Sequence, residues 1–261
     1  MSTEEYANLD VTYDSGGWIE GHDPATIEQL LNVEEKVALI ERHRPANGRT
    51  MLDIGSGMGA YMLAAQKLGM AAVGYEPSLT HSRIARDVFG LNVRNEYFRG
   101  TDERFDLILL SHVIEHIFEP APFLKMVVRS LNPGGRLLVV TPNAAAFSAR
   151  ATGVHWPMLV PKDHVTMLTP NGMKRMTPPG TSMRVSTDEY SYEFMATVGA
   201  AIRAKPTSVA GVISPVLTGP TAKVRLLKTA LTIASSPIHA LAKLTGRQGA
   251  LIAVIERPNE V

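Results

Sequence analysis

A glycine-rich turn at residues 52–59 is the part of the sequence best suited to bind a ligand. It reads LDIGSGMG and ends an apolar run, residues 50–54, that predicts a buried strand. Gly55, Gly57 and Gly59 allow a tight turn and let a ligand approach bare backbone. The amide groups that open the following helix favour a carboxylate or phosphate at the same place. The turn therefore predicts a binding site for a nucleotide-like ligand.

Two acidic residues narrow the choice of ligand. Glu76 closes the next predicted strand about 20 residues after Gly55, the offset at which an acid reaches the ribose hydroxyls of a nucleotide. The carboxylate of Asp53, just before the first glycine, is badly placed beside a pyrophosphate but suits a ligand with an ammonium and a sulfonium group. Gly55-x-Gly57-x-x-Ala60 also satisfies the dinucleotide pattern, so a nicotinamide-dependent oxidoreductase is the alternative. A further alternative is that the glycines serve only a tight turn. The position of Asp53 favours the sulfonium ligand over a dinucleotide.

Four of the eight histidines lie in segments where chemistry could take place. His112 follows the apolar run at residues 105–110, at the carboxyl end of a predicted strand, where ligands bind in open parallel sheets. His164, next to Asp163, is a second candidate. An imidazole titrates near neutral pH, so either ring could act as a general base that takes the proton of a hydroxyl group. The alternative for His112 is a polar residue that only closes a strand. The alternative for His164 is a structural histidine held by hydrogen bonds.

The other two histidines are candidates for contact with a substrate. His155 and Trp156 predict an aromatic wall beside the acceptor, with a core role for Trp156 as the alternative. His116 is expected near the substrate as well. It is adjacent to Glu115, and such a pair can hold a metal, but no further acids cluster with it. The pair is therefore expected at the start of a helix, and no metal is predicted.

A regular alternation of strands and helices must position these residues. Strands are predicted at residues 50–54, 71–75, 91–95, 105–110, 136–141, 182–188 and 250–256, and helices at residues 24–43, 60–68, 79–89 and 120–131. The strands are too apolar to have a face in water, which is typical of a parallel sheet covered by helices on both sides. The sequence therefore predicts a single α/β domain.

The other segments are expected to surround a core at residues 24–143. Residues 144–180 are irregular and rich in proline, as expected for a lid over a substrate. Residues 190–246 are predicted to form a helical insertion. Within it, residues 223–244 combine basic charges with an apolar stripe, so peripheral membrane contact or a lipid-linked substrate is one interpretation. Packing on the core or in a homodimer is the other.

Composition argues against several classes of protein. Lys and Arg number 26 against 25 Asp and Glu, and the net charge of +1 gives no drive toward nucleic acid. The absence of cysteine removes disulfides, thiolate metal sites and cysteine nucleophiles. The first residues do not read as a signal peptide, and no apolar run is long enough to span a membrane, so a cytoplasmic location is expected.

Four segments together resemble the signature motifs of class I S-adenosylmethionine-dependent methyltransferases. They are residues 52–59 (LDIGSGMG), 73–78 (VGYEPS), 105–116 (FDLILLSHVIEH) and 131–143 (LNPGGRLLVVTPN), in the order typical of the family. The resemblance implies S-adenosylmethionine as the cofactor. It also implies a Rossmann-like, mostly parallel seven-stranded sheet whose last strand, residues 250–256, is antiparallel.

The same resemblance implies which residues contact the cofactor. They are Asp53, Gly55, Ser56, Gly57, Gly59, Glu76, Pro77, Asp102, Ser111 and His112. In this family Asp53 and the first two glycines would line the methionine part of the donor, and Glu76 would hold the ribose hydroxyls. Asp102 or Glu103 would contact the adenine from a loop that is short for this purpose. Ser111 and His112 would lie near both the donor and the acceptor.

Residues 162–171 (KDHVTMLTPN) resemble the matching segment of the ubiquinone-type and natural-product methyltransferases, which implies a small-molecule acceptor. Methylation of a hydroxyl oxygen is the leading interpretation, on a sugar, a glycolipid or a secondary metabolite. Residues 190–246 are longer than this subfamily usually carries between its last two strands. A donor-binding protein without catalysis is the second alternative to the enzyme.

Overall fold

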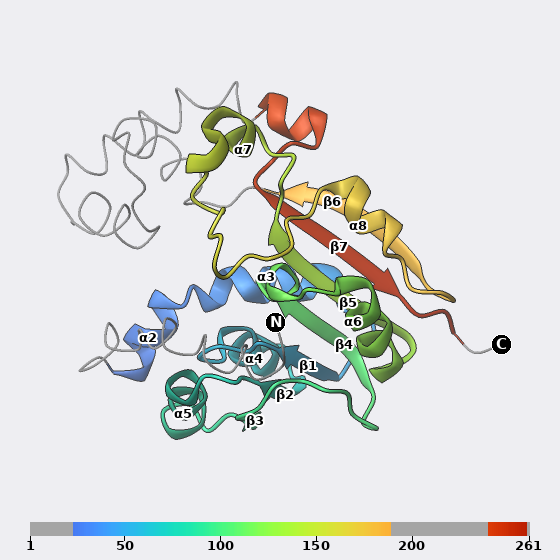
Figure 1. Cartoon of the computed structure of the whole chain (residues 1–261). Coiled ribbons are helices and arrows are strands. Elements are labelled where there is room, and N and C mark those ends of the chain that lie inside the picture. Colours follow the sequence, from blue (N-terminus) through green and yellow to red (C-terminus); the bar gives the residue numbers. More distant parts are fainter. Residues whose placement is uncertain (1–22, 189–239, 260–261) are drawn as a thin grey trace. The chain divides into compact units, whose positions relative to one another are not determined.

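The computed structural model describes residues 23–188 and 240–259, and its strands form a seven-stranded sheet (Figure 1). The strands are β1 (Thr50–Ile54), β2 (Ala71–Tyr75), β3 (Val93–Arg94), β4 (Phe105–Ser111), β5 (Leu131–Pro142), β6 (Ser182–Asp188) and β7 (Ala250–Glu256). Their order across the sheet is β3-β2-β1-β4-β5-β7-β6. The chain therefore changes direction across the sheet between β1 and β4, and ligands of open α/β sheets bind at such a switch point.

The strands at the centre of the sheet run parallel. Ile54, the last residue of β1, lies opposite Tyr75 of β2 on one side and Leu110 of β4 on the other. These three strands therefore end at the same edge of the sheet. The glycine-rich turn, Glu76 and Ser111 follow or close them, so residues far apart in the sequence meet there.

Backbone hydrogen bonds show that β7 runs antiparallel to β5. The Gly134 amide donates to the Arg257 carbonyl, and the Arg257 amide donates to the Gly135 carbonyl, each at 3.0 Å. Farther along, the Asn143 amide donates to the Gly249 carbonyl at 2.8 Å. Residue numbers fall along one strand as they rise along the other, which confirms the predicted antiparallel last strand and, with it, the Rossmann-like fold class.

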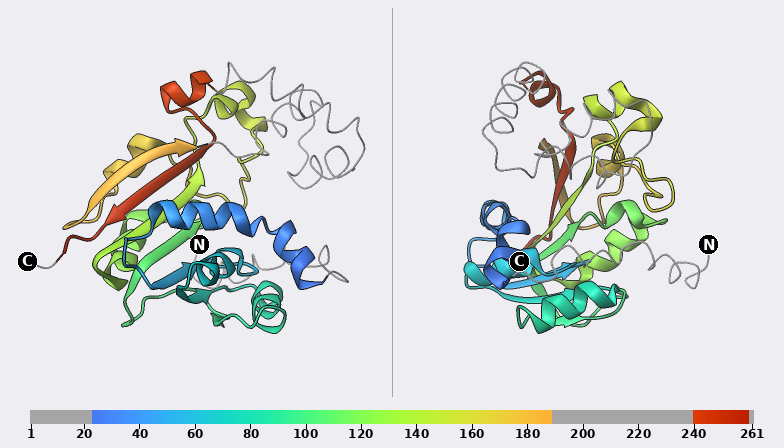
Figure 2. Two further views of the ribbon diagram at one scale, coloured as in Figure 1. Left: turned by 180° about the vertical axis from the view of Figure 1, so that it is seen from behind. Right: turned by 90° about the vertical axis from the view of Figure 1, so that its left-hand side faces the viewer.

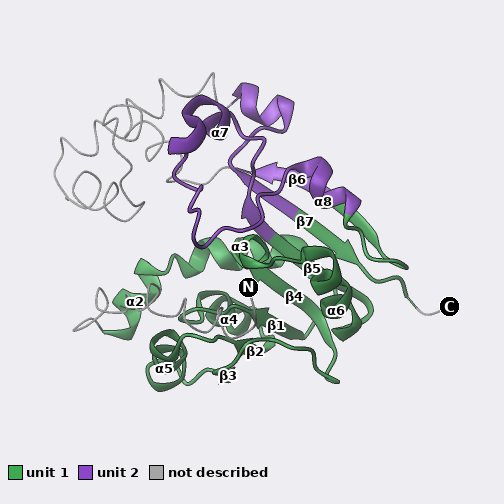
Figure 3. Cartoon of the chain, in the orientation of Figure 1, with its two compact units in different colours: residues 1–139, 176–184, 253–261 green, residues 140–175, 185–252 purple. Residues whose placement is uncertain are grey.

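The chain divides into two compact units (Figure 3). The first comprises residues 1–139, 176–184 and 253–261, and the second comprises residues 140–175 and 185–252. The boundaries fall within β5, β6 and β7, so each of these strands has residues in both units. The single-domain organisation stays a prediction.

The described part of the first unit has five α-helices. They are α2 (Pro24–Leu30), α3 (Val33–His43), α4 (Ala60–Lys67), α5 (Leu79–Asp87) and α6 (Pro120–Val127). Lys67 of α4 links the first three, because its ammonium nitrogen lies 3.2 Å from carboxylate oxygens of Glu28 and Glu34. α3 and α6 lie on opposite faces of the sheet (Figures 1 and 2). The central strands are covered on both sides, and Leu107 and Ile108 of β4 are fully buried.

The helix predicted at residues 24–43 is two helices in the structure. α2 ends at Leu30, and Asn32 adopts a left-handed φ of 51° before α3 begins at Val33. Asparagine tolerates this conformation better than most residues do. Apolar residues continue at helical spacing across the break, so their periodicity alone did not indicate it.

Three other elements differ in their bounds from the predictions. β5 begins at Leu131 rather than at residue 136, because the Gly134–Gly135 segment already pairs with Arg257. β3 is only Val93–Arg94. α6 ends at Val127 and is followed by a 3-10 turn, η4 (Val128–Ser130), in place of the last helical turn that was predicted.

The second unit contains the irregular segment that was predicted to be a lid. Its described elements include α7 (Phe147–Thr152), the 3-10 turn η5 (Gly153–His155) and α8 (Pro170–Arg175). The amide of Ala144 donates to the Leu168 carbonyl at 2.8 Å, which joins the start of this segment to a residue 24 positions later.

Most of the predicted helical insertion, residues 190–239, lies outside the described residues, and so does most of the basic amphipathic stretch at 223–244. The described residues that remain, 240–245, are helical. Within residues 23–188 and 240–259, no helix combines the length and the apolar character needed to cross a bilayer.

Candidate functional site

The glycine-rich turn is held against the end of β2 by its own backbone. The amides of Gly55 and Ser56 both donate to the Tyr75 carbonyl, at 2.8 and 3.1 Å. Gly55 has a φ of +73°, and a Cβ placed on it would lie 2.5 Å from Cγ2 of Val113. The first glycine is therefore required both by the backbone conformation and by the close approach of the segment after β4.

The next residues of the turn face different surroundings. A Cβ on Gly57 would meet nothing within 4 Å, whereas a Cβ on Gly59 would lie 2.2 Å from Cδ1 of Leu91. Gly57 therefore presents bare backbone to open space, and Gly59 allows close packing against the chain before β3. The Ser56 hydroxyl lies 2.8 Å from the position of a Cβ on Gly74, so this side chain points toward β2. A ligand contact by Ser56 would have to come from its backbone.

Glu76 is fixed by two backbone amides. Its Oε2 accepts a hydrogen bond from the Gly57 amide at 2.7 Å, and its Oε1 accepts one from the Ser78 amide at 2.8 Å. The side-chain amide of Asn95 donates to the carbonyls of Glu76 and Pro77, at 2.9 and 2.8 Å, and so holds the backbone on the other side. These four hydrogen bonds fix the carboxylate and the backbone of Glu76 at the end of β2.

Asp53 is the more deeply buried of the two acids beside the glycine-rich turn. Its side chain is 1% exposed, and its Oδ2 has no hydrogen-bond partner. Burial, with a smaller contribution from the negative charge of Glu76, raises the pKa of Asp53 from 3.8 to about 8. A buried carboxyl group without a partner is costly, and a cationic ligand group would remove that cost.

Two side chains near Ser111, at the end of β4, were not predicted from the sequence. They are Tyr61 and Lys36. The Ser111 hydroxyl donates to the Tyr61 hydroxyl or accepts from it, at 3.3 Å. The ammonium nitrogen of Lys36 on α3 lies 5.6 Å from the centre of the Tyr61 ring. The position of Tyr61, in the first turn of the helix after the glycines, was a signal that could have found it. Lys36 had no such signal, because its contact depends on the packing of α3 against α4.

His112 forms a pair with Glu115 on the turn that follows β4. Nδ1 of His112 lies 3.0 Å from Oε1 of Glu115, and the two side chains are 36% and 0% exposed. His112 has a left-handed φ of 56°, which turns the chain sharply into η3 (Ile114–His116). Burial acts to raise the pKa of Glu115, but the hydrogen bond from His112 and the nearby imidazole charges outweigh it and lower the pKa. Glu115 is therefore ionised at neutral pH.

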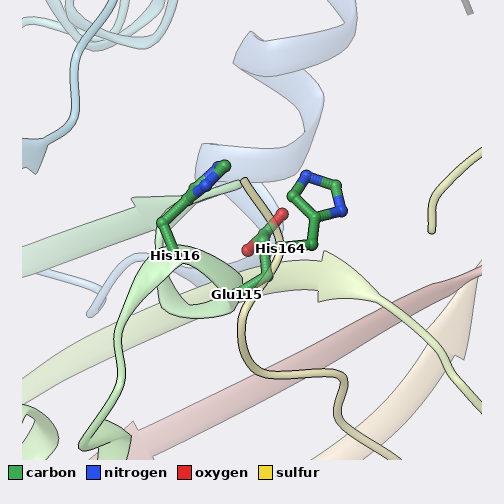
Figure 4. A group of neighbouring side chains, drawn as sticks. All are labelled: Glu115, His116 and His164. Atoms are coloured by element: carbon green, nitrogen blue, oxygen red, sulfur yellow. The ribbon is translucent and has the colours of Figure 1, made fainter. Parts of the chain in front are cut away.

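The close-up in Figure 4 shows Glu115 and His116 side by side on η3. They are the last two residues of this 3-10 turn, and α6 begins only at Pro120, so the pair does not start a helix as expected. His164, also drawn there, belongs to the second unit. Its Nδ1 lies 2.6 Å from the carbonyl oxygen of Met158 and therefore carries the hydrogen of that bond. Its neighbour Asp163 is not the group that orients the ring at this nitrogen.

The remaining predicted residues lie in varied surroundings. Trp156 is 4% exposed, which favours the core alternative, whereas His155 is exposed. Asp102 is exposed in the loop before β4. Its neighbour Glu103 forms an ion pair with Arg94, whose guanidinium group stacks 5.1 Å from the centre of the Tyr75 ring. Glu103 is thus bound to Arg94 at the end of β3. A contact between Asp102 and the adenine stays a prediction.

The sequence model of the methyltransferase domain matches residues 28–177, more than half of the chain. The chain belongs to the class I S-adenosylmethionine-dependent methyltransferases. The resemblance of the four motifs is thereby confirmed. The geometry fits the donor of this family, since an unpartnered buried carboxyl group, a glycine facing open space and a fixed acid lie together at the ends of β1 and β2.

Curated relatives and solved structures agree with this methyltransferase family. A ubiquinone biosynthesis O-methyltransferase of Maricaulis maris is 29% identical over 174 residues, which are 57% of this chain and 68% of the relative. The plantazolicin methyltransferase BpumL, solved with S-adenosylhomocysteine, has a TM-score of 0.54 at 14% identity, over 97% of this chain and 92% of that one. The [4+2]-cyclase SpnF has a TM-score of 0.54 at 16% identity, over 87% and 81%. At such identities the structures show the shared fold alone.

The match to most of these curated relatives is partial. The chain spans between 43% and 50% of the length of further ubiquinone biosynthesis O-methyltransferases that it resembles.

Proposed function

We propose that this methyltransferase moves the methyl group of S-adenosylmethionine to a hydroxyl oxygen of a small organic acceptor, with His112 as the general base. The single observation that carries the proposal is the buried Asp53 carboxyl group, which lacks a partner at Oδ2 beside the open backbone of Gly57. Neither a tight turn alone nor a pyrophosphate accounts for a buried, unpartnered acid at this place.

The donor would be held by residues that already have defined positions. Glu76 would hold the ribose hydroxyls, because the amides of Gly57 and Ser78 fix its carboxylate at the end of β2. Asp53 would pair with the ammonium group of the methionine part. Bound S-adenosylmethionine supplies an activated methyl group, so the protein has to orient the acceptor and exclude water.

The pair of His112 and Glu115 supports transfer to oxygen. The ionised Glu115 accepts the hydrogen on Nδ1, which leaves Nε2 of His112 as the nitrogen that can take a proton from a hydroxyl group. His164, the other candidate, has its Nδ1 bonded to a backbone carbonyl and lacks a comparable acid at that nitrogen. We therefore assign the base to His112.

The acceptor class rests on the relatives. The curated relatives are named as O-methyltransferases of ubiquinone biosynthesis, which favours oxygen and a small molecule. A glycan or lipid-linked acceptor, peripheral membrane contact and a homodimer are compatible extensions. The likeness to a cyclase makes a direct test of methyl transfer necessary, because the same fold can carry other chemistry.

The donor is tested by thermal unfolding with S-adenosylhomocysteine, S-adenosylmethionine and NADP. A ligand at about 100 times its Kd stabilises the native state by about 2.7 kcal/mol, so the two sulfur nucleosides should raise the unfolding temperature and NADP should not. Protection by NADP alone would overturn the donor assignment.

The reaction is tested by formation of S-adenosylhomocysteine with a panel of phenols, catechols and sugar alcohols. For an accepted hydroxyl, His112→Ala should lower kcat about 100-fold or more while S-adenosylhomocysteine still binds. His43→Ala, at the far end of α3, is the matched control and should retain activity. Donor binding without transfer to any of these hydroxyls would favour the non-catalytic alternative.

A further inference from the structure

Tyr61 places a phenol beside the last residue of β4. It stands in the first turn of α4, and its hydroxyl lies 3.3 Å from the Ser111 hydroxyl. In the part of the chain that the structure describes, these two hydroxyls have no other hydrogen bond. One pair of side chains thus joins the helix that follows the glycine-rich turn to the strand that leads into His112.

The Tyr61 hydroxyl keeps its hydrogen at neutral pH. Burial is the main cause that raises the pKa of Tyr61 above its usual value. The hydrogen bond with Ser111 acts in the opposite direction without outweighing burial, and the negative charge of Asp53 adds to the rise. A phenol is a stronger acid than an alkyl hydroxyl, so it is the better donor of the pair. When Ser111 accepts from Tyr61, it still has its own hydrogen to donate to a third group.

Ser111 directly precedes the proposed base, His112. It closes β4 at the sheet edge where β1 and β2 also end, and it is only half-buried. Negative charge develops on the oxygen of an acceptor hydroxyl as its proton leaves. A hydrogen bond from a fixed neutral hydroxyl stabilises such an oxygen and holds it in one orientation. Hydroxyls in a chain polarise one another, so donation by Tyr61 strengthens donation by Ser111.

We propose that Tyr61 is a positioning residue for methyl transfer: it donates to Ser111, and Ser111 donates to the acceptor oxygen while His112 takes the proton from that oxygen. The inference rests on the proposed function, and it gives Tyr61 a part in the reaction. The proton moves from the acceptor hydroxyl to Nε2 of His112, and Tyr61 and Ser111 keep their own protons throughout. Tyr61 does not touch the acceptor, so it acts through Ser111 alone.

The test is a double-mutant cycle on turnover, with the hydroxyl compound that the wild-type chain methylates fastest. Tyr61→Phe removes one oxygen atom and should lower kcat about 10-fold, the range of one hydrogen bond. KM for the acceptor and the Kd of S-adenosylhomocysteine should stay within about twofold, because neither ligand touches Tyr61. Ser111→Ala should lower kcat further, because it removes the bond to the charged oxygen itself. The double variant should match Ser111→Ala within about twofold, since Tyr61 has no route to the acceptor without Ser111.

Urea denaturation of the same three variants, without ligand, checks the hydrogen bond independently of activity. The losses in free energy of unfolding should not add, because either single substitution breaks the same bond. Tyr97→Phe, the same change at an exposed position, is the matched control and should leave both kcat and stability as in the wild-type chain.

Three results would contradict the role of Tyr61. A Tyr61→Phe variant with wild-type kcat, or losses of kcat that multiply in the double variant, would overturn it and leave the proposed function intact. A loss of kcat with an equal loss of affinity for S-adenosylhomocysteine would also overturn it, because Tyr61 would then support the donor site. A wild-type chain that methylates none of the hydroxyl compounds would overturn the proposed function and this inference with it.

Discussion

Three carboxyl groups in or beside the sheet differ in protonation because their hydrogen-bond donors differ. Asp53 has an unpartnered oxygen, so burial dominates and its pKa rises to about 8. For Glu115 burial acts in the same direction, but the bond from His112 outweighs it and lowers the pKa. Burial also acts to raise the pKa of Asp106. The pKa is nevertheless lowered, because amide and side-chain donors at the starts of β1 and β5 surround the carboxylate. Asp53, whose Oδ2 has no hydrogen-bond donor, is the one of the three acids that lies beside the glycine-rich turn.

The raised pKa of Asp53 predicts a pH-dependent cost of folding. The native state holds this proton up to about pH 8, whereas an unfolded Asp loses it near pH 3.9, so stability falls as pH rises between these values. Asp53→Asn removes the titration. The variant should gain free energy of unfolding relative to wild type between pH 5 and pH 8, by up to about 1.4 kcal/mol per pH unit.

Urea denaturation of both proteins at several pH values, without ligand, measures this difference. Glu96→Gln, at an exposed position, is the control and should show no such pH trend. A stability difference between Asp53→Asn and wild type that stays constant from pH 5 to pH 8 would mean that Asp53 is ionised throughout.

At the residue scale, the sequence was sufficient to place Asp53 and Glu76 at the ends of β1 and β2, and their contacts with a ligand stay predictions. Asp53 and Glu76 could be predicted because their positions are set by distance from the glycines along a strand. The pairing of His112 with Glu115 could not, since it depends on a left-handed turn at His112. Lys36 could not either, because nothing in a helix sequence tells which surface lysine will meet the ring of another helix.

At the element scale, the turn between β1 and α4 contains two glycines in different surroundings. Gly57 and Gly59 share a left-handed backbone, with φ of +53° and +88°, yet only Gly59 has a neighbour, Leu91, in the space of a Cβ. The same substitution should therefore have different consequences at two positions that sequence patterns treat alike.

Gly57→Ala should weaken binding of S-adenosylhomocysteine by 10-fold or more and cost only about 1–2 kcal/mol of stability, the strain of a left-handed alanine. Gly59→Ala carries the same strain and adds overpacking against Leu91, about 1–3 kcal/mol more. Chemical denaturation and calorimetry on both variants give the two quantities separately.

A double substitution checks the cause of the Gly59 effect. In the Gly59→Ala background, Leu91→Ala should cost less than it does in the wild-type chain, because it makes room for the new methyl group. Additive costs would show that the clash with Leu91 is not the reason. A Gly57→Ala variant that binds S-adenosylhomocysteine as wild type does would remove Gly57 from the donor site.

The elements themselves were largely predictable, and the errors have physical causes. β1, β2 and β7 have the predicted bounds, because apolar runs between turn residues leave little choice. The break at Asn32 escaped prediction because periodicity cannot register a single left-handed residue. The early start of β5 escaped because its first residues pair with a strand more than a hundred residues away.

At the scale of the whole molecule, a few polar side chains join the ends of the sheet. Asp106 on β4 accepts hydrogen bonds from the amides of Arg49 and Thr50 and from the side chain of Asn132, at 2.8 to 3.0 Å. Such bonds connect residues that are tens of positions apart in the chain. They help to set the register of the parallel strands, on which the shared edge of β1, β2 and β4 depends.

Arg136 makes connections of this kind to two other elements. From β5, its Nε donates to Glu256 of β7 at 3.1 Å, and its Nη1 donates to the carbonyls of His43 and Arg44, at 3.3 and 3.2 Å, where α3 ends. A planar guanidinium group suits this fork of acceptors, and the site is only partly exposed. Arg136 therefore ties the last strand and the first long helix to the middle of the sheet.

Arg136→Ala should lower the free energy of unfolding by about 1–3 kcal/mol, because it leaves the Glu256 carboxylate and two helix-terminal carbonyls without this donor. Arg184→Ala is the matched control: Arg184 approaches the same carboxylate only to 3.9 Å, and its side chain is 71% exposed. Its loss should change stability by no more than about 0.5 kcal/mol. Urea denaturation measures the free energy of unfolding of both variants. Equal losses in the two variants would mean that Arg136 contributes no more than an ion pair with Glu256.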